Sequence, residues 1–146
     1  MTIIKMNESH IQQIAELEKL CFNDPWSINS IASELENCLS HWLVALDGDR
    51  VVGYVGSQTV LGETDMMNIA IHPDYRKQGI AMSLVSELIR DLSKQGSHSL
   101  MLEVRTSNSP AKSLYYKIGF EVVGIRKNYY RNPREDALIL RKEWSL

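Results

Sequence analysis

The stretch Arg76-Lys77-Gln78-Gly79-Ile80-Ala81 connects a run that predicts a strand to a run that predicts a helix. The strand-like run is Met66–Ile71, and apolar residues at helical spacing follow the loop: Met82, Leu84, Val85, Leu88, Ile89 and Leu92. A short, basic, Gly-containing loop that opens a helix offers free N–H groups and a positive dipole end, which together bind phosphate. Taken alone, the pattern is equally typical of a solvated helix N-terminus. The loop has neither a Gly-x-Gly-x-x-Gly nor a Gly-Lys-Ser/Thr nucleotide fingerprint.

A second cluster reads Leu102-Glu103-Val104-Arg105-Thr106-Ser107-Asn108 and continues to Leu114-Tyr115 and Gly119-Phe120. Together the two clusters resemble the GNAT superfamily of acetyl-coenzyme A-dependent N-acetyltransferases. Within it the chain is most similar to the RimI family, whose members acetylate the N-terminal alanine of a small-subunit ribosomal protein. The closer likeness runs from about Ile3 to Lys142. It is carried by Cys21-Phe22, Pro25-Trp26-Ser27, Asn68-Ile69-Ala70, Leu102-Glu103-Val104-Arg105, Ser107-Asn108 and Arg126-Lys127-Asn128-Tyr129-Tyr130 with Glu135-Asp136-Ala137.

The resemblance implies a set of cofactor-binding residues. Main-chain amides of the loop would hold the diphosphate of acetyl-coenzyme A, and a strand N–H near Ile69 to Ile71 would polarise the thioester carbonyl. Asn108 would contact the cofactor, although it is also placed to cap a helix. The implied set is Ile69, Ala70, Ile71, Arg76, Lys77, Gln78, Gly79, Ile80, Ala81, Asn108 and Tyr115.

The resemblance also implies two catalytic residues. Glu103 would accept the amine proton through a water, and a carboxylate buried beside an apolar strand suits a base that works near neutrality. Tyr115 lies on the inward stripe of its helix and would protonate the departing thiolate. Each has a structural alternative: Glu103 could simply pair with Arg105, and the Tyr115 hydroxyl could satisfy a backbone carbonyl.

The resemblance to the RimI family further implies an acceptor groove formed by the turn between the first two helices, Phe22–Trp26, and by the final hairpin, Tyr129–Arg134. Trp26 and Tyr130 would then be wall residues, with a purely structural role as the alternative for each. A basic second residue of the substrate could meet acidic side chains, which are also typical of a solvated face: Glu63, Asp65, Glu135 and Asp136. The segment Thr64-Asp65-Met66-Met67 departs from the more aliphatic sequence of relatives, which bears on acceptor choice more than on the chemistry.

Composition sets the class of protein. A chain of 146 residues with 44% hydrophobic and 23% charged residues predicts one folded domain, 1–146. A net charge of −2 argues against a broad nucleic-acid surface. Without an apolar run long enough for a membrane span, or a signal sequence, we expect a cytoplasmic protein, monomeric or weakly dimeric. The two cysteines, Cys21 and Cys38, are expected to be reduced thiols at or near the core; no metal site is predicted.

Periodicity predicts an α/β fold in the order strand, two helices, three strands, helix, strand, helix and two strands. The resemblance implies the GNAT fold, a mixed and mostly antiparallel sheet with helices on both faces. Its two central parallel strands would part where they end, near Ile71 and Arg105, and admit the pantetheine arm. The predicted segments are Thr2–Lys5, Glu8–Cys21, Ser27–Asn37, His41–Leu46, Val51–Val60, Asp65–Ile71, the helix after Ala81, Ser99–Arg105, Pro110–Ile118, Glu121–Tyr130 and Glu135–Glu143.

Energetics favour an α-amino acceptor. An α-amino group has a pKa of about 8 and a lysine amine about 10.4, so freeing the base at pH 7 costs roughly 1.4 against about 4.6 kcal/mol. These costs are compatible with the leading hypothesis, which the resemblance implies: a RimI-type N-terminal acetyltransferase that works through a direct ternary complex. Neither cysteine has a His-based constellation that would support a covalent route. The alternatives are a GNAT enzyme for a small amine, such as a polyamine or aminoglycoside, and a non-catalytic acyl-coenzyme A-binding module.

Overall fold

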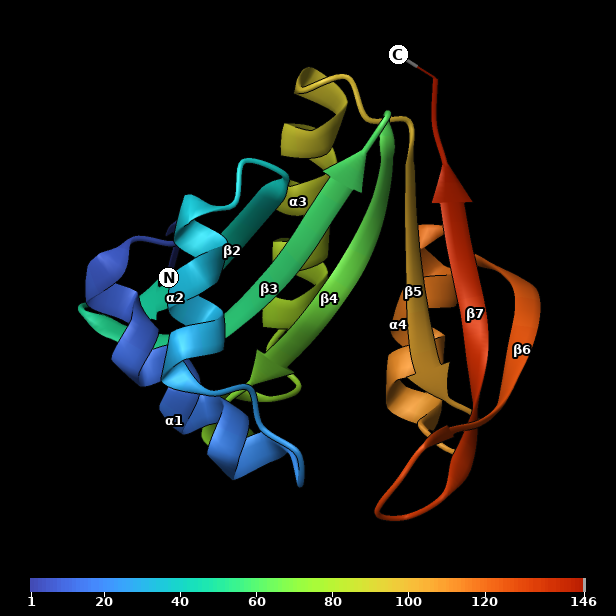
Figure 1. The fold of residues 1–146 in the computed structure, drawn as a ribbon, viewed down its shortest axis with the longest axis horizontal. Helices are drawn as coiled ribbons and strands as arrows, with labels where there is room; N and C mark the ends of the chain where they lie inside the picture. Colours follow the sequence, from blue (N-terminus) through green and yellow to red (C-terminus); the bar gives the residue numbers. More distant parts are fainter. Residues whose placement is uncertain (146) are drawn as a thin grey trace.

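The computed structural model describes residues 1–145, which form a seven-stranded sheet with helices on both of its faces (Figure 1). The strands are β1 (Thr2–Lys5), β2 (Ser40–Asp47), β3 (Arg50–Val60), β4 (Glu63–Ile71), β5 (Ser99–Arg105), β6 (Glu121–Tyr130) and β7 (Glu135–Glu143). The helices are α1 (Ile11–Cys21), α2 (Ile28–Glu36), α3 (Ile80–Lys94) and α4 (Ser109–Ile118), with short 3₁₀ turns η1 (Glu8–His10) and η2 (Pro73–Tyr75). The predicted order of elements is confirmed.

The sheet has the strand order β1-β2-β3-β4-β5-β7-β6, and β4 and β5 are its one parallel pair among residues 1–145. These two strands pair only at their beginnings, where Glu63–Asp65 lies beside Ser99–Met101. Beyond that point they diverge toward their C-terminal ends (Figure 1). The predicted parting of two central parallel strands is confirmed.

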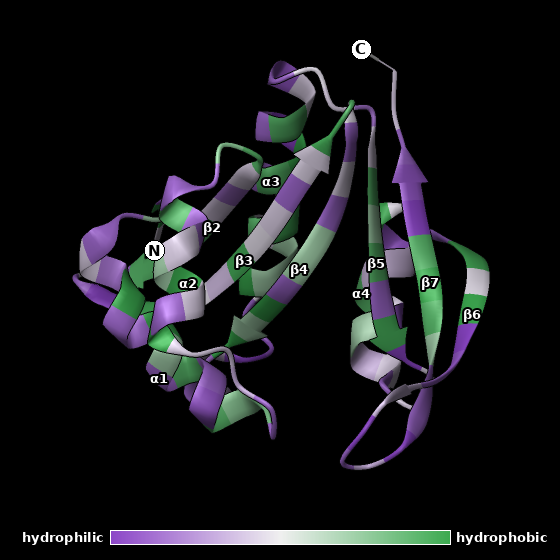
Figure 2. Ribbon diagram, viewed as in Figure 1, coloured by the Kyte–Doolittle hydropathy of each residue, from purple (hydrophilic) through white to green (hydrophobic). Residues whose placement is uncertain are grey.

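Each face of the sheet carries its own core. On one face α3 and α4 cover β2 to β5, with Leu84, Leu88 and Leu100 fully buried between the layers. On the other face α1 and α2 pack on β2 and β3 around Ile14 and Ile31. Hydrophobic residues run along β5 and the middle of β7, as Figure 2 shows. The strands β2 to β4 thus contribute to both cores, whereas β5 and β7 contribute buried residues to the first core alone.

The N-terminal helix differs from its prediction in one detail. The sequence predicts a single helix from Glu8, whereas the first turn is the 3₁₀ turn η1 and α1 begins at Ile11. A reciprocal capping box explains the tighter turn. The side chain of Asn7 accepts from the Ser9 N–H at 2.9 Å, and the Asn7 N–H donates to Nδ1 of His10 at 3.0 Å.

The two cysteines are free thiols in different surroundings. Cys21 ends α1 and is half-buried, as expected. The expectation of a core or near-core position is wrong for Cys38, which is exposed in the turn after α2, because α2 ends at Glu36. Within residues 1–145, each helix is too short or too polar to cross a bilayer.

Candidate active site at the parting of two strands

A cavity of about 620 Å³ lies where β4 and β5 part. Its walls come from four places in the sequence: the turn between α1 and α2, the end of β4, the end of β5 with the start of α4, and the β6–β7 hairpin. The lining residues used below are Trp26, Asn68, Ile69, Glu103, Asn108, Tyr115 and Tyr130. The fold thus brings together the two predicted catalytic residues and both predicted wall residues.

The end of β4 turns main-chain groups that no neighbouring strand pairs toward the side of this cavity. In the β3–β4 ladder, the His72 N–H donates to the Val52 carbonyl at 2.8 Å. Antiparallel pairs alternate between bonded and non-bonded, so Ala70 and Asn68 bond to β3. Ile69 and Ile71 therefore point their N–H and C=O groups toward β5, which has already moved away. A ligand with peptide-like amides can complete this open edge.

A bulge helps to set the direction of that edge. Gly56 of β3 lies opposite Asn68, but the next residue, Ser57, lies opposite Met66, so Met67 is left without a partner. One extra residue bends the strand locally and increases its twist. The bulge falls where β4 leaves β5, so it contributes to the opening between the two strands.

Glu103 projects from β5 into the cavity, but its surroundings differ from the prediction. Its side chain is about one-fifth exposed (21%), and Oε1 accepts from Nε of Arg126 at 3.2 Å. The suggested pairing with Arg105 is wrong. Arg105 instead pairs with Glu135, with 3.2 Å between Nη1 and Oε1. Arg105 ends β5 and Glu135 begins β7, and these two strands are neighbours in the sheet. Glu103 is thus a partly solvated carboxylate at the cavity wall, where a water can reach it.

Tyr115 has the inward position that helix periodicity predicts. Its ring is 4% exposed and packs edge-on against Phe120, with centroids 5.4 Å apart. The hydroxyl donates to Sδ of Met66 at 3.8 Å, so the alternative of a backbone carbonyl partner is wrong. Thioether sulfur is a weak acceptor. Burial raises the pKa of Tyr115, which keeps the phenol protonated and able to donate at neutral pH.

The loop before α3 has the conformation expected of an anion cradle. Gly79 takes φ +79° as the N-cap of α3, a left-handed conformation that favours glycine, and no side chain caps this helix end. The first N–H groups of α3 therefore lack intrahelical partners. Gln78, Gly79 and Ile80 line a hollow of about 280 Å³ beside the loop. The phosphate-binding role of the loop remains a prediction.

Arg76 belongs to the predicted cradle, but its side chain turns away from it. Nε donates to the Ile71 carbonyl at 3.1 Å, and Nη2 donates to Sγ of Cys21 at 3.5 Å. The guanidinium thus joins the end of β4 to the end of α1. The main-chain N–H of Arg76 donates to the Pro73 carbonyl at 3.4 Å, so in this structure both the side chain and the main-chain donor of Arg76 are engaged within the fold.

Asn108 combines the two roles considered for it. Oδ1 accepts from the Ala111 N–H at 3.2 Å, which makes Asn108 the N-cap of α4, and the residue also lines the cavity. Nearby, Glu135 accepts from the Ser107 N–H at 2.6 Å and from Oγ1 of Thr106 at 3.0 Å. Hydrogen bonds from the Ser107 side chain and main chain, and then from Thr106 and Arg105, lower the pKa of Glu135 to about 2. This carboxylate fixes the start of α4, and with it Tyr115.

Trp26 and Tyr130 both line the cavity, Trp26 from the turn between α1 and α2 and Tyr130 from the end of β6, and their role as walls of an acceptor groove stays a prediction. The guanidinium of Arg105 lies 4.4 Å from the Tyr130 ring centroid, and burial raises the pKa of Tyr130 to about 12. Arg105 also donates to the carbonyls of Arg131 and Pro133, which fastens the β6–β7 hairpin to β5. Asn23, in the turn after α1, donates to the Asn132 carbonyl at 2.6 Å. This hydrogen bond connects the turn after α1 to the β6–β7 hairpin, so the two sides of the groove are in contact at this point.

The acidic residues suggested for a basic acceptor residue do not line the cavity. Glu63 and Asp65 lie at the start of β4, and Glu63 pairs with Arg141. Asp136 accepts from the Asn128 N–H at 2.8 Å, and Glu135 is engaged as described. The alternation of residues along β4 could not reveal that Glu63 and Asp65 lie at the end of this strand that is distant from the cavity. Among the described lining residues the acidic ones are Asp24 and Glu103.

Sequence reasoning missed a buried carboxylate behind the site. Glu18 of α1 is fully buried and accepts from the Tyr54 hydroxyl and from Nδ2 of Asn68, both at 2.6 Å. The signal was its position on the apolar stripe of α1, between Leu17 and Cys21. A charged residue at a stripe position is either paired or functional.

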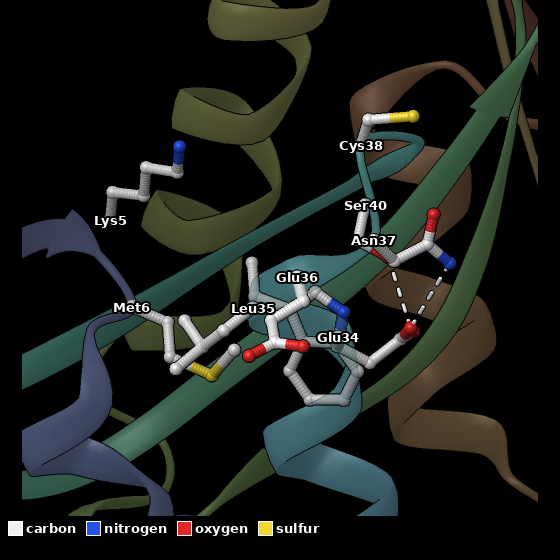
Figure 3. A pocket seen from close by; sticks show the side chains of 9 residues that line it. Lys5, Met6, Glu34, Leu35, Glu36, Asn37, Cys38 and Ser40 are labelled. Atoms are coloured by element: carbon white, nitrogen blue, oxygen red, sulfur yellow. Dashed lines mark hydrogen bonds between the residues drawn. The ribbon is translucent and has the colours of Figure 1, made fainter.

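A separate cavity of about 170 Å³ lies at the C-terminal end of α2, lined by Glu34, Ser40 and Trp42 among others (Figure 3). Glu34 accepts there from Oγ of Ser40 at 3.0 Å and from Nε2 of Gln58 at 2.9 Å. Its carboxylate is satisfied within the fold. None of the predicted site residues lines this cavity.

Comparison with known proteins places the chain. The sequence model of the acetyltransferase (GNAT) family matches residues 11–120. The ribosomal protein bS18-alanine N-acetyltransferase of Haemophilus influenzae is 39% identical over 145 residues, which cover 96% of this chain and 97% of that protein. The crystal structure of the ribosomal-protein-S18-alanine N-acetyltransferase from Escherichia coli has a TM-score of 0.91 and 33% identity, covering 99% of this chain and 94% of that one.

A more distant structure shares the fold. Arabidopsis thaliana NAA60 in complex with acetyl-CoA has a TM-score of 0.87 at 17% identity and covers 97% of each chain. The family match spans most of the sequence, and the nearer relatives cover nearly all of it. The chain, with β4 and β5 parted around its candidate site, belongs to the acetyltransferase (GNAT) family.

Proposed function

We propose that this protein transfers the acetyl group of acetyl-coenzyme A to the N-terminal α-amino group of a ribosomal protein, an alanine amine of the kind named for its bS18-acetylating relatives. The observation that carries the proposal is the open edge of β4. Ile69 lines the cavity that also contains Glu103 and Tyr115, and the alternation along β4 turns the main-chain polar groups of Ile69 toward β5. A peptide-like pantetheine arm and a peptide acceptor both suit such an edge.

The residues of the chain divide the reaction between them. The bound thioester supplies an activated acetyl group, and a main-chain N–H of Ile69 or Ile71 stabilises negative charge on its carbonyl oxygen. Glu103 accepts the proton that the attacking amine loses, through one water. The new C–N bond forms as the C–S bond breaks, and Tyr115 gives its proton to the sulfur. Glu103 then releases its proton to solvent and Tyr115 takes one up from solvent, which restores both residues.

The cofactor assignment rests on the same geometry. Residues Ile69, Asn108 and Tyr115 line the large cavity, and Gln78, Gly79 and Ile80 line the hollow beside the loop. We assign the first group to the pantetheine and thioester end and the second to the diphosphate. Free N–H groups at the start of α3 and the helix dipole favour an anion there.

The acceptor end suits a peptide. Trp26 and Tyr130 offer aromatic walls, and the cavity carries cationic Arg105 and Arg131 beside its two carboxylates. A strongly acidic crevice, which a polyamine would need, is absent from the described lining. Aromatic walls with mixed charges favour a short N-terminal segment over a free polycation.

Intact mass spectrometry tests the proposal. The protein is incubated with acetyl-coenzyme A and unacetylated bS18, and in competition with a short peptide that begins Ala-Arg and with spermidine. The proposal predicts one acetyl group on the bS18 N-terminus and on the peptide, with spermidine unmodified. Preferential modification of spermidine would assign the chain to small amines, and tight cofactor binding without any product would leave it a binding module.

A further inference from the structure

Glu18 is a buried carboxylate that the proposed reaction does not use. Its side chain is 0% exposed, and among residues 1–145 it has no cationic partner. Oε1 accepts from both Tyr54 and Asn68, whereas Oε2 has no hydrogen-bond partner in the described residues. Burial raises the pKa of Glu18. Burying a carboxylate without a cation is costly, so this position calls for a reason beyond packing.

The contact with Asn68 links this carboxylate to the cavity. Nδ2 of Asn68 donates to Glu18 at 2.6 Å, while Oδ1 of the same amide accepts from the Ile69 N–H at 3.0 Å. Asn68 and Ile69 both line the cavity, directly after the bulge at Met67. The Ile69 N–H is one of the donors that face the gap left by β5. Two hydrogen bonds in series, called the relay below, thus connect Glu18 of α1 through the Asn68 amide to the Ile69 N–H at the open edge of β4.

We propose that Glu18 is a positioning residue for acetyl transfer, which acts through the Asn68 amide to fix the direction of the Ile69 N–H. The inference rests on the proposed function. An Asn amide has two orientations that differ by a half turn, and a carboxylate, which only accepts, stabilises the one with Nδ2 toward it. That orientation leaves Oδ1 facing Ile69. The reverse orientation would place two donors against each other.

Fixing this N–H matters because it is a candidate donor to the thioester carbonyl oxygen. Donors that are ordered before the reaction stabilise developing charge without reorganisation. With Asn68 held by Glu18, its Oδ1 accepts from the Ile69 N–H on the side of β4 that faces the gap, and an incoming carbonyl oxygen would share that proton with Oδ1 or take the place of Oδ1. A freely rotating Asn68 would leave the donor oriented only part of the time.

The test compares three single variants by turnover and by the ¹⁵N–¹H resonance of the Ile69 amide. Glu18→Gln keeps size and one acceptor, but it can also present its NH₂ group to Asn68. Asn68→Ala removes the relay itself. Tyr54→Phe is the matched control, because it removes the other hydrogen bond to the same oxygen of Glu18 and leaves the Asn68 contact intact.

The proposal predicts that Glu18→Gln lowers kcat about tenfold, since hydrogen bonds to charged groups are about twice as strong as neutral ones. KM for the peptide should stay within about twofold, the Ile69 resonance should shift, and Tyr54→Phe should resemble wild type. Asn68→Ala should reproduce the kcat loss, and the Glu18→Gln/Asn68→Ala double variant should lose no more than Asn68→Ala.

Additive losses in the double variant, an unmoved Ile69 resonance in Glu18→Gln, or equal losses in Glu18→Gln and Tyr54→Phe would overturn the proposal. If Glu18→Gln does not fold, Asn68→Ala decides alone by its turnover, and a wild-type kcat in that variant overturns the proposal. The resonance is measured on the protein without substrate. A wild-type protein that fails to acetylate the peptide would therefore refute the proposed function separately from the Glu18–Asn68–Ile69 link.

Discussion

Replacing Tyr115 by Phe removes one hydroxyl group from the cavity. The effect of this substitution on catalysis can be distinguished from its effect on stability. The hydroxyl donates to Sδ of Met66 at 3.8 Å, a weak acceptor, while the buried ring packs on Phe120. Phe keeps the ring and its packing. We therefore expect the free energy of unfolding to change by no more than about 0.5 kcal/mol, because no strong hydrogen bond is lost.

The effect on the reaction should be much larger. A positioned general acid contributes about 10²- to 10⁴-fold to the rate, which corresponds to roughly 3 to 5 kcal/mol in the barrier. Because burial raises the pKa of Tyr115, the phenol remains protonated as the pH rises through neutrality. The loss in Tyr115→Phe should consequently be similar at every pH from 6 to 9.

The assay follows thiol release during acetylation of an Ala-starting peptide, with urea unfolding measured in parallel. Tyr116→Phe is the matched control, since Tyr116 is the next residue on the same helix and is 46% exposed. Its kcat should equal that of wild type. A Tyr115→Phe enzyme with wild-type kcat, or one whose activity falls only in proportion to its stability, would refute the assignment of Tyr115 as the acid.

Three further predictions concern the base, the core and the hairpin. Glu103→Gln should lower kcat about 100-fold at pH 7 and less at pH 9, where the free amine is abundant; pH–rate profiles check this, and a pH-independent loss would contradict it. Gly56→Ala should destabilise by about 2–3 kcal/mol, because the added Cβ would lie 2.3 Å from the buried Trp42 ring. Gly124→Ala meets only the flexible end of a side chain at 3.3 Å, so equal urea midpoints for the two variants would count against this reasoning. The pKa of Glu135 is about 2 in the fold against an ordinary value of 4.5, so its contribution to stability is complete above about pH 4.5 and is lost as the pH falls toward 2. The stability difference between wild type and Glu135→Gln should shrink over that interval, whereas a constant difference would exclude the contribution.

Much of the fold could be predicted because the local sequence patterns favour the same helices and strands that the packing of the tertiary structure requires. The segments Ser99–Arg105 and Glu121–Tyr130 have the predicted bounds, and in the first of them Leu100, Leu102 and Val104 alternate as buried residues up to the turn at Thr106. Gly119 ends α4 with φ +112°, as a glycine directly after an apolar stripe predicts. The 3₁₀ turn before α1 was missed, because it depends on a hydrogen bond to the His10 ring that periodicity does not contain.

The site was only partly predictable, because its charges are settled by tertiary contacts. The resemblance directed attention to Glu103 and Tyr115, and both line the cavity. The partner of Glu103 is Arg126 of a strand that is not its neighbour in the sheet order, which no spacing along β5 could show. The inward turn of the Arg76 side chain depends in the same way on where α1 ends.

A crystal structure with bound acetyl-coenzyme A would show how the loop before α3 and the parted strands hold the cofactor. We expect the diphosphate on the main-chain N–H groups between Arg76 and Ala81, and the thioester carbonyl oxygen within hydrogen-bond distance of the Ile69 or Ile71 N–H. The sulfur should face the Tyr115 hydroxyl, with Glu103 on the acceptor side of the carbonyl carbon. A ligand that leaves the loop before α3 empty, or whose sulfur lies away from both Glu103 and Tyr115, would contradict the account.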